Sequence, residues 1–474
     1  MLIPILALAF YIAFIPHRSY PYLVHIDEWI HMAYSEAILQ AQDTTYTEPF
    51  TGRGTKNIVT NLELSFQLFW GIFHQISGLS WIAIFRYFPS IIFMITVLSA
   101  FVFGRREGFG WEAALFTCLI PTGVGIMGPA FLVPVAMGLL FIPLSLFIIF
   151  NFRTWQSYLV IFAFISFVIA IHPPSALLLI LILSPFILLN LKDNLKLSLG
   201  LALALAFPFL VTLPWIARSG AVKNVINSIF TPQPLPQFID LPWITRDYGY
   251  LPILFALLGT FLLSMKGGKK NYGLILGLLA LLLMLTTFYA FHYGSDIMYL
   301  RGLPFMMLMT GLVASAGLMG IRRLEPLTML GIKIKAPLIA QIVGISLSLA
   351  LVGFTLSIAI PNRQSRPYYH MIEQEDYEAF IWIRENIDES YYKAILDPWK
   401  ATAFTAVTSK YVYTRTHVAP TTTDTGTLEF LSDGCTDTDF LRKNDISIVY
   451  SPEACNNPDL AEVRENIYLL KNGE

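Results

Sequence analysis

Long apolar segments recur along this chain and constrain its fold more than any other feature. A helix needs about 17 to 25 mostly apolar residues to cross a lipid bilayer. Hydrophobic residues make up 55% of the sequence and charged residues only 13%, against about 25% charged residues in soluble domains. The sequence therefore predicts a polytopic α-helical membrane protein with about 11 transmembrane helices. The expected spans are residues 1–15, 81–104, 111–127, 131–150, 157–171, 175–189, 197–215, 250–264, 274–291, 303–321 and 337–360.

The charges of the chain argue against a nucleic-acid partner and predict an orientation in the membrane. The formal net charge of -1 shows no basic excess of the kind that binds nucleic acid. Lysines and arginines of the short loops, such as Arg105, Arg153 and Lys196, fall in alternate connections, which are expected to be cytoplasmic. An odd number of spans then places the N-terminus in the cytoplasm and the polar C-terminal segment outside. In a prokaryote the membrane would be the plasma membrane.

This orientation predicts two domains. Residues 1–360 form a transmembrane domain with exterior loops at 16–80 and 218–249, and residues 361–474 form a small exterior α/β domain. In the tail, residues 374–387 have the pattern of an amphipathic helix, and three short apolar stretches that end at proline indicate strands. An exterior tail also predicts a disulfide between Cys435 and Cys455.

The stretch HIDEWIH, directly after the first span, concentrates titratable side chains over seven positions. It contains His25, Asp27, Glu28 and His31. Since His31 lies one helical turn after Asp27, a carboxylate and an imidazole are expected on one face, an arrangement that suits general-base chemistry. This stretch is the leading candidate for a functional site.

Two other interpretations of the same stretch remain open. A short interfacial helix beginning near Asp27 would use that carboxylate as a cap, with Trp29 and Tyr34 as anchors at the level of the lipid headgroups. Alternatively, the acids and histidines would bind a divalent metal. The spacing H-x-D-E-x-x-H is not a standard zinc spacing, so a metal site is the less favoured of the two.

The layout of this part of the chain resembles the GT-C glycosyltransferases, enzymes that take sugars from polyprenyl-phosphate carriers. A membrane-embedded first span is followed by an exterior loop that opens with an aspartate at the start of a short aromatic helix. In that superfamily the first exterior loop carries the catalytic acid. The resemblance therefore implies Asp27 as the catalytic residue and Glu28 as the second candidate, with His25 and His31 assisting at the substrate.

Three later stretches are similar to the catalytic subunit of oligosaccharyltransferase. "IPTGVGIMGPAFLVPVAMGLLFI" resembles the segment that joins its third and fourth spans, and the passage containing "HYGSDIMYLRGLP" resembles its late spans, where an arginine near a helix start faces the carrier phosphate. The stretch "AILDPWKATAF" lies where that subunit has its WWDYG acceptor-recognition motif. The resemblance implies substrate-binding roles for residues in the last two stretches: Arg301, His292, Tyr293, Asp296 and Trp399.

A structural role for Arg301 is also open. Arg301 lies at the outer end of a span, where an ionisable residue is by default a candidate for function. It would instead anchor the end of the helix if it pairs with Asp296.

The departures from that subunit favour a particular chemistry. Residues 128–138 contain no acid where the subunit has a second acidic motif that helps hold a metal, and "DPWKAT" stands in place of WWDYG. The loop 218–249 offers Asp240 and Asp247 but no glutamate. A pyrophosphate-linked donor benefits from a divalent ion at its leaving group, whereas arginines can stabilise a monophosphate.

The sequence thus favours a metal-independent transferase without a cofactor; a divalent Mg or Mn ion is not favoured. The expected donor is a sugar carried on a polyprenyl (dolichyl-type) phosphate, and the expected acceptor is an exterior glycan, protein or lipid. Two alternatives belong to other classes. One is a non-catalytic relative that binds the lipid carrier. The other is a lipid transporter, which usually shows internal repeats and charges near the bilayer midplane.

Overall fold

The computed structural model describes residues 2–123, 125–232, 244, 247–325, 337–366, 368–416 and 419–471. The chain divides into two compact units, each assembled from two segments that are far apart in the sequence. The helical unit comprises Met1–Ser19 and Arg86–Tyr368, and the α/β unit comprises Tyr20–Phe85 and Tyr369–Glu474.

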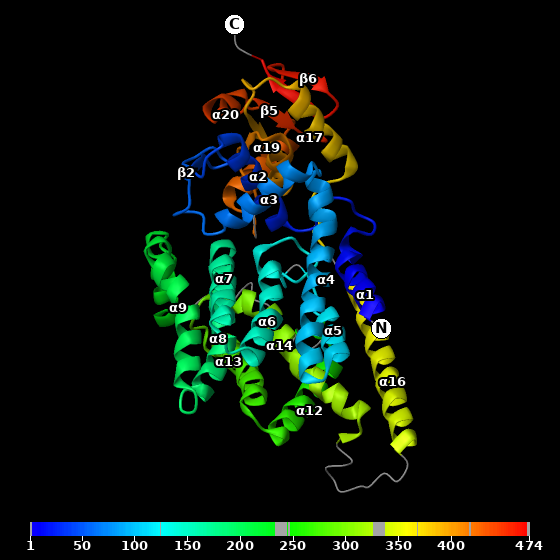
Figure 1. Cartoon of the computed structure of the whole chain (residues 1–474). Helices are drawn as coiled ribbons and strands as arrows, with labels where there is room; N and C mark the ends of the chain where they lie inside the picture. The colour runs from blue at the N-terminus through cyan, green and yellow to red at the C-terminus, as the bar shows by residue number, and fades with distance from the viewer. Residues whose placement is uncertain are drawn as a thin grey trace. The chain divides into compact units, whose positions relative to one another are not determined.

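The helical unit is a bundle of mostly long apolar helices, of which α6, α7, α8 and α9 run side by side (Figure 1). Seven helices of the described chain are long and apolar enough to cross a membrane, and three shorter apolar helices accompany them. The chain is therefore an integral, multi-pass membrane protein. The helices are α1 (Leu2–Phe14), η1 (Ile15–His17), α4 (Trp81–Glu107, which begins in the α/β unit), α5 (Gly110–Cys118), α6 (Pro134–Asn151), α7 (Trp155–Ile171), α8 (Pro173–Asn190), α9 (Leu195–Arg218), α10 (Ala221–Phe230), α12 (Tyr250–Lys266), α13 (Lys269–Phe291), α14 (Asp296–Arg322) and α16 (Pro337–Gln364).

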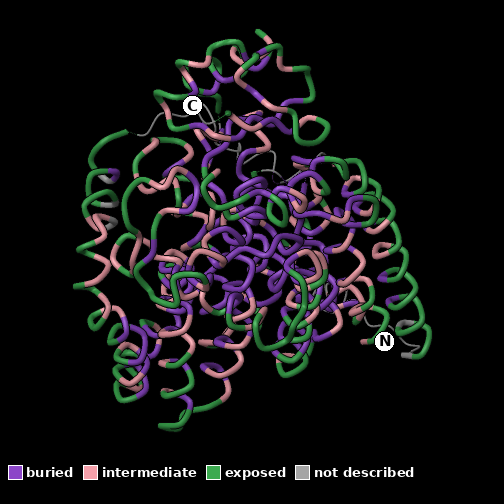
Figure 2. Tube along the Cα trace, turned by 90° about the horizontal axis from the view of Figure 1, so that it is seen from above, coloured by how far each residue is buried: buried purple, intermediate pink, exposed green. Residues whose placement is uncertain are grey.

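Helix α14 lies at the centre of this bundle. In its most apolar window 94% of the residues are buried, against 28% in α9 and 22% in α16, whose exposed apolar sides are available to lipid (Figure 2). Glycines let α12 approach α14 closely. A Cβ on Gly259 would lie 2.0 Å from the Val313 carbonyl oxygen, and a Cβ on Gly317 would lie 2.2 Å from that of Phe255. Small residues of this kind are typical of helix contacts in membranes.

The predicted continuous helix over residues 111–127 is wrong, because the helix there stops after nine residues. Helix α5 ends at Cys118, and the described residues between 119 and 133 form irregular backbone with an isolated bridge between Gly123 and Ile126. Pro121 cannot continue a helix without losing a hydrogen bond. A Cβ on Gly128 would meet the Pro121 carbonyl oxygen at 2.2 Å, so the turn back depends on this glycine. Residues 119–133, apart from Val124, are called the irregular segment below.

The α/β unit contains a five-stranded mixed sheet with the strand order β4-β3-β5-β7-β6. Strands β4, β3 and β5 are parallel, and β7 and β6 are antiparallel to their neighbours. The C-terminal segment supplies α17 (Gln374–Asn386), β3 (Lys393–Ile395), α18 (Ala401–Thr408), β4 (Tyr411–Val412), α19 (Thr422–Ser432), α20 (Thr438–Lys443), β5 (Ile448–Tyr450), β6 (Leu460–Arg464) and β7 (Ile467–Leu470). The amphipathic helix predicted at 374–387 is α17, which confirms that prediction, and the three predicted strands contain β3, β4 and β5.

The N-terminal segment completes the same unit. It supplies α2 (Ile26–Ala41), a short hairpin of β1 (Tyr46–Thr47) and β2 (Thr55–Lys56), and α3 (Leu64–Ser77). Helix α2 packs against both α3 and α18. The predicted disulfide between Cys435 and Cys455 is present, and it joins the end of α19 to the loop before β6.

Candidate active site

The first cluster of candidate residues lies at the N-terminus of α2. His25 is the N-cap residue of this helix, and its Nδ1 accepts a hydrogen bond from the Asp27 backbone N–H at 3.1 Å. Glu28 reaches back, and its Oε2 accepts from the Val24 N–H at 3.1 Å. This reciprocal arrangement satisfies donors at the start of the helix in the manner of a capping box. The expectation that the Asp27 carboxylate caps the helix is therefore wrong, because the cap is His25.

Exposure separates the two neighbouring carboxylates. Glu28 is 0% exposed and is engaged with the backbone that precedes the helix, whereas Asp27 is partly exposed. Of the two residues, Asp27 is therefore the more accessible, and Glu28 is enclosed at the start of α2. The geometry thus distinguishes an accessible acid from a supporting acid.

Aromatic side chains continue the cluster away from His25. The Tyr369 N–H donates to the Val24 carbonyl oxygen at 3.2 Å, and the Tyr369 ring lies 5.4 Å from the His25 ring. Trp399 stands edge-on to Tyr369 with 5.0 Å between ring centroids. Burial and then the negative charge of Asp27 raise the pKa of Tyr369, so its hydroxyl stays protonated at neutral pH. The structure therefore brings the predicted residues His25 and Trp399 together through Tyr369, a residue that the sequence analysis did not identify.

His31 and Trp29 are packed inside the unit. His31 is 4% exposed, and its ring meets Phe66 edge-on at 4.8 Å. Trp29 is 0% exposed, so its predicted role as an anchor among lipid headgroups is wrong. The sequence does not show this burial, because it results from the tertiary packing of α3 and α18 against α2.

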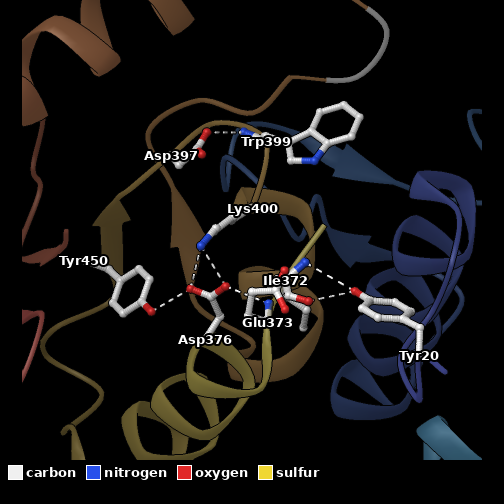
Figure 3. Close-up of polar contacts among 8 residues, drawn as sticks. All are labelled: Tyr20, Ile372, Glu373, Asp376, Asp397, Trp399, Lys400 and Tyr450. Atoms are coloured by element: carbon white, nitrogen blue, oxygen red, sulfur yellow. Dashed lines mark hydrogen bonds and ion pairs between the residues drawn. The ribbon is translucent and has the colours of Figure 1, made fainter. Parts of the chain in front are cut away.

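A polar network holds the loop that carries Trp399 (Figure 3). The Lys400 Nζ lies 2.8 and 2.7 Å from the two carboxylate oxygens of Asp376, and the Tyr450 hydroxyl donates to Asp376 at 2.7 Å. Asp376 also accepts from the Glu373 N–H at 2.8 Å, within the capping box of α17. Because Lys400 is the N-cap residue of α18, this network fixes the start of α18 and with it the position of Trp399.

Arg415 is the second residue near Asp27 that the sequence analysis missed. Its guanidinium lies 3.9 Å over the ring of Phe50, which is fully buried and packs edge-on against Tyr34 of α2 at 5.7 Å. Burial lowers the pKa of Arg415, while negative charges that include Asp27 oppose the shift. In the sequence, Arg415 stands out only as a cation that follows a short apolar strand. No local pattern shows that this strand lies beside α2, so the residue could not be predicted.

A cavity of about 270 Å³ lies farther along α2. Its walls include Ala33, Ala37, Thr405 and Tyr411. Ala33 and Ala37 stand six and ten positions beyond Asp27, about 9 and 15 Å along a helix axis. The cavity therefore belongs to the α2–α18 groove and does not contain the Asp27 carboxylate.

The second cluster lies in the helical unit, at the turn between α13 and α14. His292 ends α13 in a left-handed conformation with φ +61°, and the Ser295 side chain caps α14. The Gly294 N–H donates to the Ser228 carbonyl oxygen of α10 at 2.9 Å, so α10 is attached to this turn. Tyr293 is 43% exposed, and Asp296 accepts a hydrogen bond from the Ile297 N–H at 2.8 Å. Three of the predicted substrate-binding residues thus share one turn.

Arginines surround the irregular segment next to this turn. Arg301, in the second turn of α14, contacts the Met127 sulfur, and Arg363 of α16 donates to the Leu119 carbonyl oxygen. Arg366 forms an ion pair with Asp247, and a Cβ on Gly123 would lie 2.9 Å from its Nη1. Where the oligosaccharyltransferase resemblance predicts an acidic motif, this chain therefore gathers cations. Asp240, the other acid of the loop 218–249, lies outside the described residues.

The described residues do not fit a divalent metal. No group of three or more histidine, cysteine, aspartate or glutamate side chains in the described ranges is placed to hold an ion. At the start of α2, His25 Nδ1 and Glu28 Oε2 already accept backbone hydrogen bonds.

The comparisons with known proteins identify the fold. No protein-family model and no curated protein sequence matches the chain. Among solved structures, the oligosaccharyltransferase of Archaeoglobus fulgidus in its apo form matches with a TM-score of 0.66 at 12% identity, over 95% of this chain and 69% of that one. ArnT from Cupriavidus metallidurans bound to undecaprenyl phosphate matches with a TM-score of 0.58 at 11% identity, over 100% and 98% of the two chains. The arabinofuranosyltransferase AftD from Mycobacteria matches with a TM-score of 0.58 at 13% identity, over 100% of this chain but 40% of its own.

These three neighbours are GT-C glycosyltransferases, so the predicted resemblance to that superfamily is confirmed at the level of the fold. The match to the oligosaccharyltransferase extends over nearly the whole chain, including the α/β unit. At 11 to 13% identity the likeness is one of architecture.

Proposed function

We propose that this protein is a metal-independent membrane glycosyltransferase that transfers a sugar from a polyprenyl monophosphate carrier to an exterior acceptor. The accessible Asp27 carboxylate at the start of α2 carries this proposal, because His25 and Glu28 already stabilise the helix start. The GT-C architecture supports the class of reaction. ArnT, one of the structures with this fold, is known with undecaprenyl phosphate bound, which supports a lipid-phosphate donor here.

In the proposed reaction, Asp27 accepts the proton of an acceptor hydroxyl as that oxygen attacks the anomeric carbon of the sugar. The new bond joins the acceptor oxygen to this carbon, and the bond to the phosphate oxygen breaks with its electron pair leaving on the phosphate. Attack from the side opposite the leaving group inverts the configuration. A positioned general base of this kind contributes about 10² to 10⁴ in rate.

The arginine-rich part of the helical unit is suited to the leaving phosphate. Arg301 would donate charge-assisted hydrogen bonds to it, with His292 as a second ligand and Tyr293 beside them. The His292 Nδ1 is buried and has no hydrogen-bond acceptor or donor among the described residues. Asp296 is engaged at the start of α14 and would tune the charge of the turn.

Aromatic residues of the α/β unit are suited to the acceptor. Trp399 and Tyr369 are partly exposed and form one aromatic cluster with His25, and aromatic rings pack well against the C–H face of a sugar. The network around Asp376 would keep Trp399 in place. His31, packed on Phe66, would support α2 from inside.

We place the α/β unit outside the cell and the N-terminus in the cytoplasm. The disulfide between Cys435 and Cys455 supports this orientation, because disulfides persist in oxidising compartments and are rare in the cytosol. The cationic short loops, for example around Arg105, would then be cytoplasmic.

A transfer assay tests the proposal. Purified protein is given radiolabelled polyprenyl-phosphate sugars with and without EDTA, as wild type, as Asp27→Asn and as the control Asp439→Asn, which changes an exposed aspartate of α20. We expect turnover that survives EDTA in wild type and control and falls at least about 100-fold in Asp27→Asn.

Loss of wild-type turnover in EDTA would refute the metal-independent mechanism. Equal turnover in Asp27→Asn and wild type would refute the role of Asp27. A wild type that binds the carrier lipid but consumes no donor would favour the non-catalytic, lipid-binding alternative.

A further inference from the structure

Arg415 is a cation of the α/β unit whose guanidinium packs on a buried aromatic ring. Its guanidinium rests on the ring of Phe50 at 3.9 Å, and Phe50 is held by a hydrogen bond from the Val412 N–H to its carbonyl oxygen at 2.6 Å. A guanidinium stacked on a buried ring is fixed in orientation and keeps its N–H edge for another partner. Within the described ranges, Arg415 Nη1 is buried and has no hydrogen-bond acceptor.

Neighbouring acids do not supply that acceptor. Glu48 is the nearest acid in the sequence to Phe50, and its Oε2 accepts from the Phe50 N–H, the Thr51 N–H and the Thr51 hydroxyl at 3.2, 2.7 and 3.0 Å. Glu48 therefore stabilises the turn after β1. A buried cationic N–H without an acceptor is costly, and its usual explanation is a ligand or ion that binds there.

The position of Arg415 connects it to the candidate base. Tyr34 lies seven residues after Asp27, two helical turns along the same face of α2. Tyr34 contacts Phe50, and Phe50 supports Arg415, so Arg415 is linked through Phe50 to the Tyr34 turn of α2, about 10 Å along the helix axis from Asp27. The charge of Asp27 acts on Arg415 accordingly.

We infer that Arg415 is an oxyanion-binding residue of the Asp27 site. Its ligand is a phosphate or carboxylate group of a substrate, which accepts the hydrogen bond that Nη1 lacks. The planar fork of arginine matches the two oxygens of such groups, and its charge attracts them. This inference rests on the proposed function and extends it, because it adds a fixed positive charge near the base.

The oxyanion has two sources in a transfer reaction. If it is the phosphate of the lipid carrier, Arg415 neutralises the leaving group. If it is a carboxylate of the acceptor, Arg415 selects an acidic glycan such as one that ends in a uronic acid. The chemistry of recognition is the same, and a binding experiment with separate probes distinguishes the sources.

Equilibrium binding to the full-length protein in detergent tests the inference without turnover. The probes are undecaprenyl phosphate, glucuronate, and glucose as the neutral match of glucuronate. The variants are Arg415→Gln and Arg415→Lys, with Arg384→Gln as the control, because Arg384 is an exposed arginine of α17 in the same unit. A thermal melt of each variant verifies folding.

We expect Arg415→Gln to weaken the binding of one of the two anions by about 10- to 100-fold and to leave glucose unchanged. A loss confined to undecaprenyl phosphate assigns Arg415 to the donor, and a loss confined to glucuronate assigns it to an acidic acceptor. Arg415→Lys keeps the positive charge but not the planar guanidinium group, so it should weaken anion binding less than Arg415→Gln does. If Arg415→Gln does not fold, the comparison of Arg415→Lys with wild type decides.

Unchanged binding of both anions in a folded Arg415 variant would overturn the inference, as would an equal loss in Arg384→Gln. Asp27→Asn provides the link to the proposed function. That substitution removes a negative charge near Arg415, so anion binding should be retained or strengthened even though turnover is lost. Failure of the transfer assay with intact Arg415-dependent binding would then count against the proposed chemistry alone.

Discussion

The network centred on Asp376 allows a quantitative prediction about the α/β unit. Asp376 is 4% exposed and receives hydrogen bonds from the Glu373 N–H, the Tyr450 hydroxyl and Lys400. In Asp376→Ala the loss of the cap costs about 1 kcal/mol, and the loss of the Tyr450 bond to a charged acceptor costs about 1.5–3 kcal/mol. The Lys400 side chain is 27% exposed, so its pairing adds only about 0.5–1 kcal/mol. We expect Asp376→Ala to lose roughly 3–5 kcal/mol in total.

Lys400→Met provides the decisive comparison. This substitution removes the same ion pair but leaves Asp376 with its bonds from Tyr450 and Glu373. We therefore expect a smaller loss of about 1–2 kcal/mol, which exceeds the value of the pairing itself because the buried Asp376 carboxylate also loses a hydrogen-bond donor. Tyr450→Phe removes one hydrogen bond and should fall between the two variants.

Thermal unfolding in detergent, followed by tryptophan fluorescence at a fixed scan rate, measures these differences. At roughly 2–4 °C per kcal/mol for a unit of this size, Asp376→Ala should lower the transition by about 6–20 °C and Lys400→Met by about 2–8 °C. Equal losses in the two variants would refute the reasoning, because they would mean that the ion pair alone carries the stability of the network.

Three further predictions concern the same unit. The double variant Cys435→Ser/Cys455→Ser should lose about 3 kcal/mol of stability and unfold at a lower temperature, since the disulfide closes a loop with a sequence separation of 20. Dithiothreitol should lower the unfolding temperature of the wild type but not that of the double variant. The pKa of Tyr34 is raised to about 12, chiefly by burial, whereas in the unfolded chain it is about 10. The protonated tyrosine therefore contributes to stability fully below pH 10, and this contribution is lost as the pH rises through 12. Unfolding curves at successive pH values should show a smaller loss of stability over this range for Tyr34→Phe than for wild type. Glu28→Gln should keep transfer activity within about tenfold of wild type, in contrast to Asp27→Asn, because Gln retains an acceptor for the cap. A folded Glu28→Gln protein that is inactive in the transfer assay would contradict the assignment of a catalytic role to Asp27 and a supporting role to Glu28.

The sequence predicts the apolar helices well, because exposing backbone polar groups or charges to lipid is costly and spanning segments are therefore long apolar stretches that are easy to recognise. The failure at 111–127 has a physical cause in the same terms. Apolar side chains continue through Pro121 and Gly128, so hydropathy shows no break, while the backbone turns and its polar groups bind within the protein. Leu119, for example, offers its carbonyl oxygen to Arg363, a residue of the last long helix.

The candidate site was predictable only in part. Asp27 and Trp399 are candidates because the sequence around them resembles that of a known superfamily. The structure brings His25 and Trp399 into one aromatic cluster. Tyr369 and Arg415 are not predictable in this way. Their environments depend on contacts between segments far apart in the chain, and no local pattern reports which ring a distant guanidinium will cover.

The assembly of the α/β unit from two distant segments has a consequence for how the protein is made. Residues 20–85 leave the ribosome early, but α2 stays without α18 beside it until the chain beyond 369 has been synthesised. Through that interval Asp27 would stand on an unfinished scaffold, without Tyr369, Trp399 or Arg415. Under the proposed function, a newly made chain would therefore be inactive until the chain beyond residue 369 has been made and has packed against α2. Activity itself would then report that biogenesis is complete.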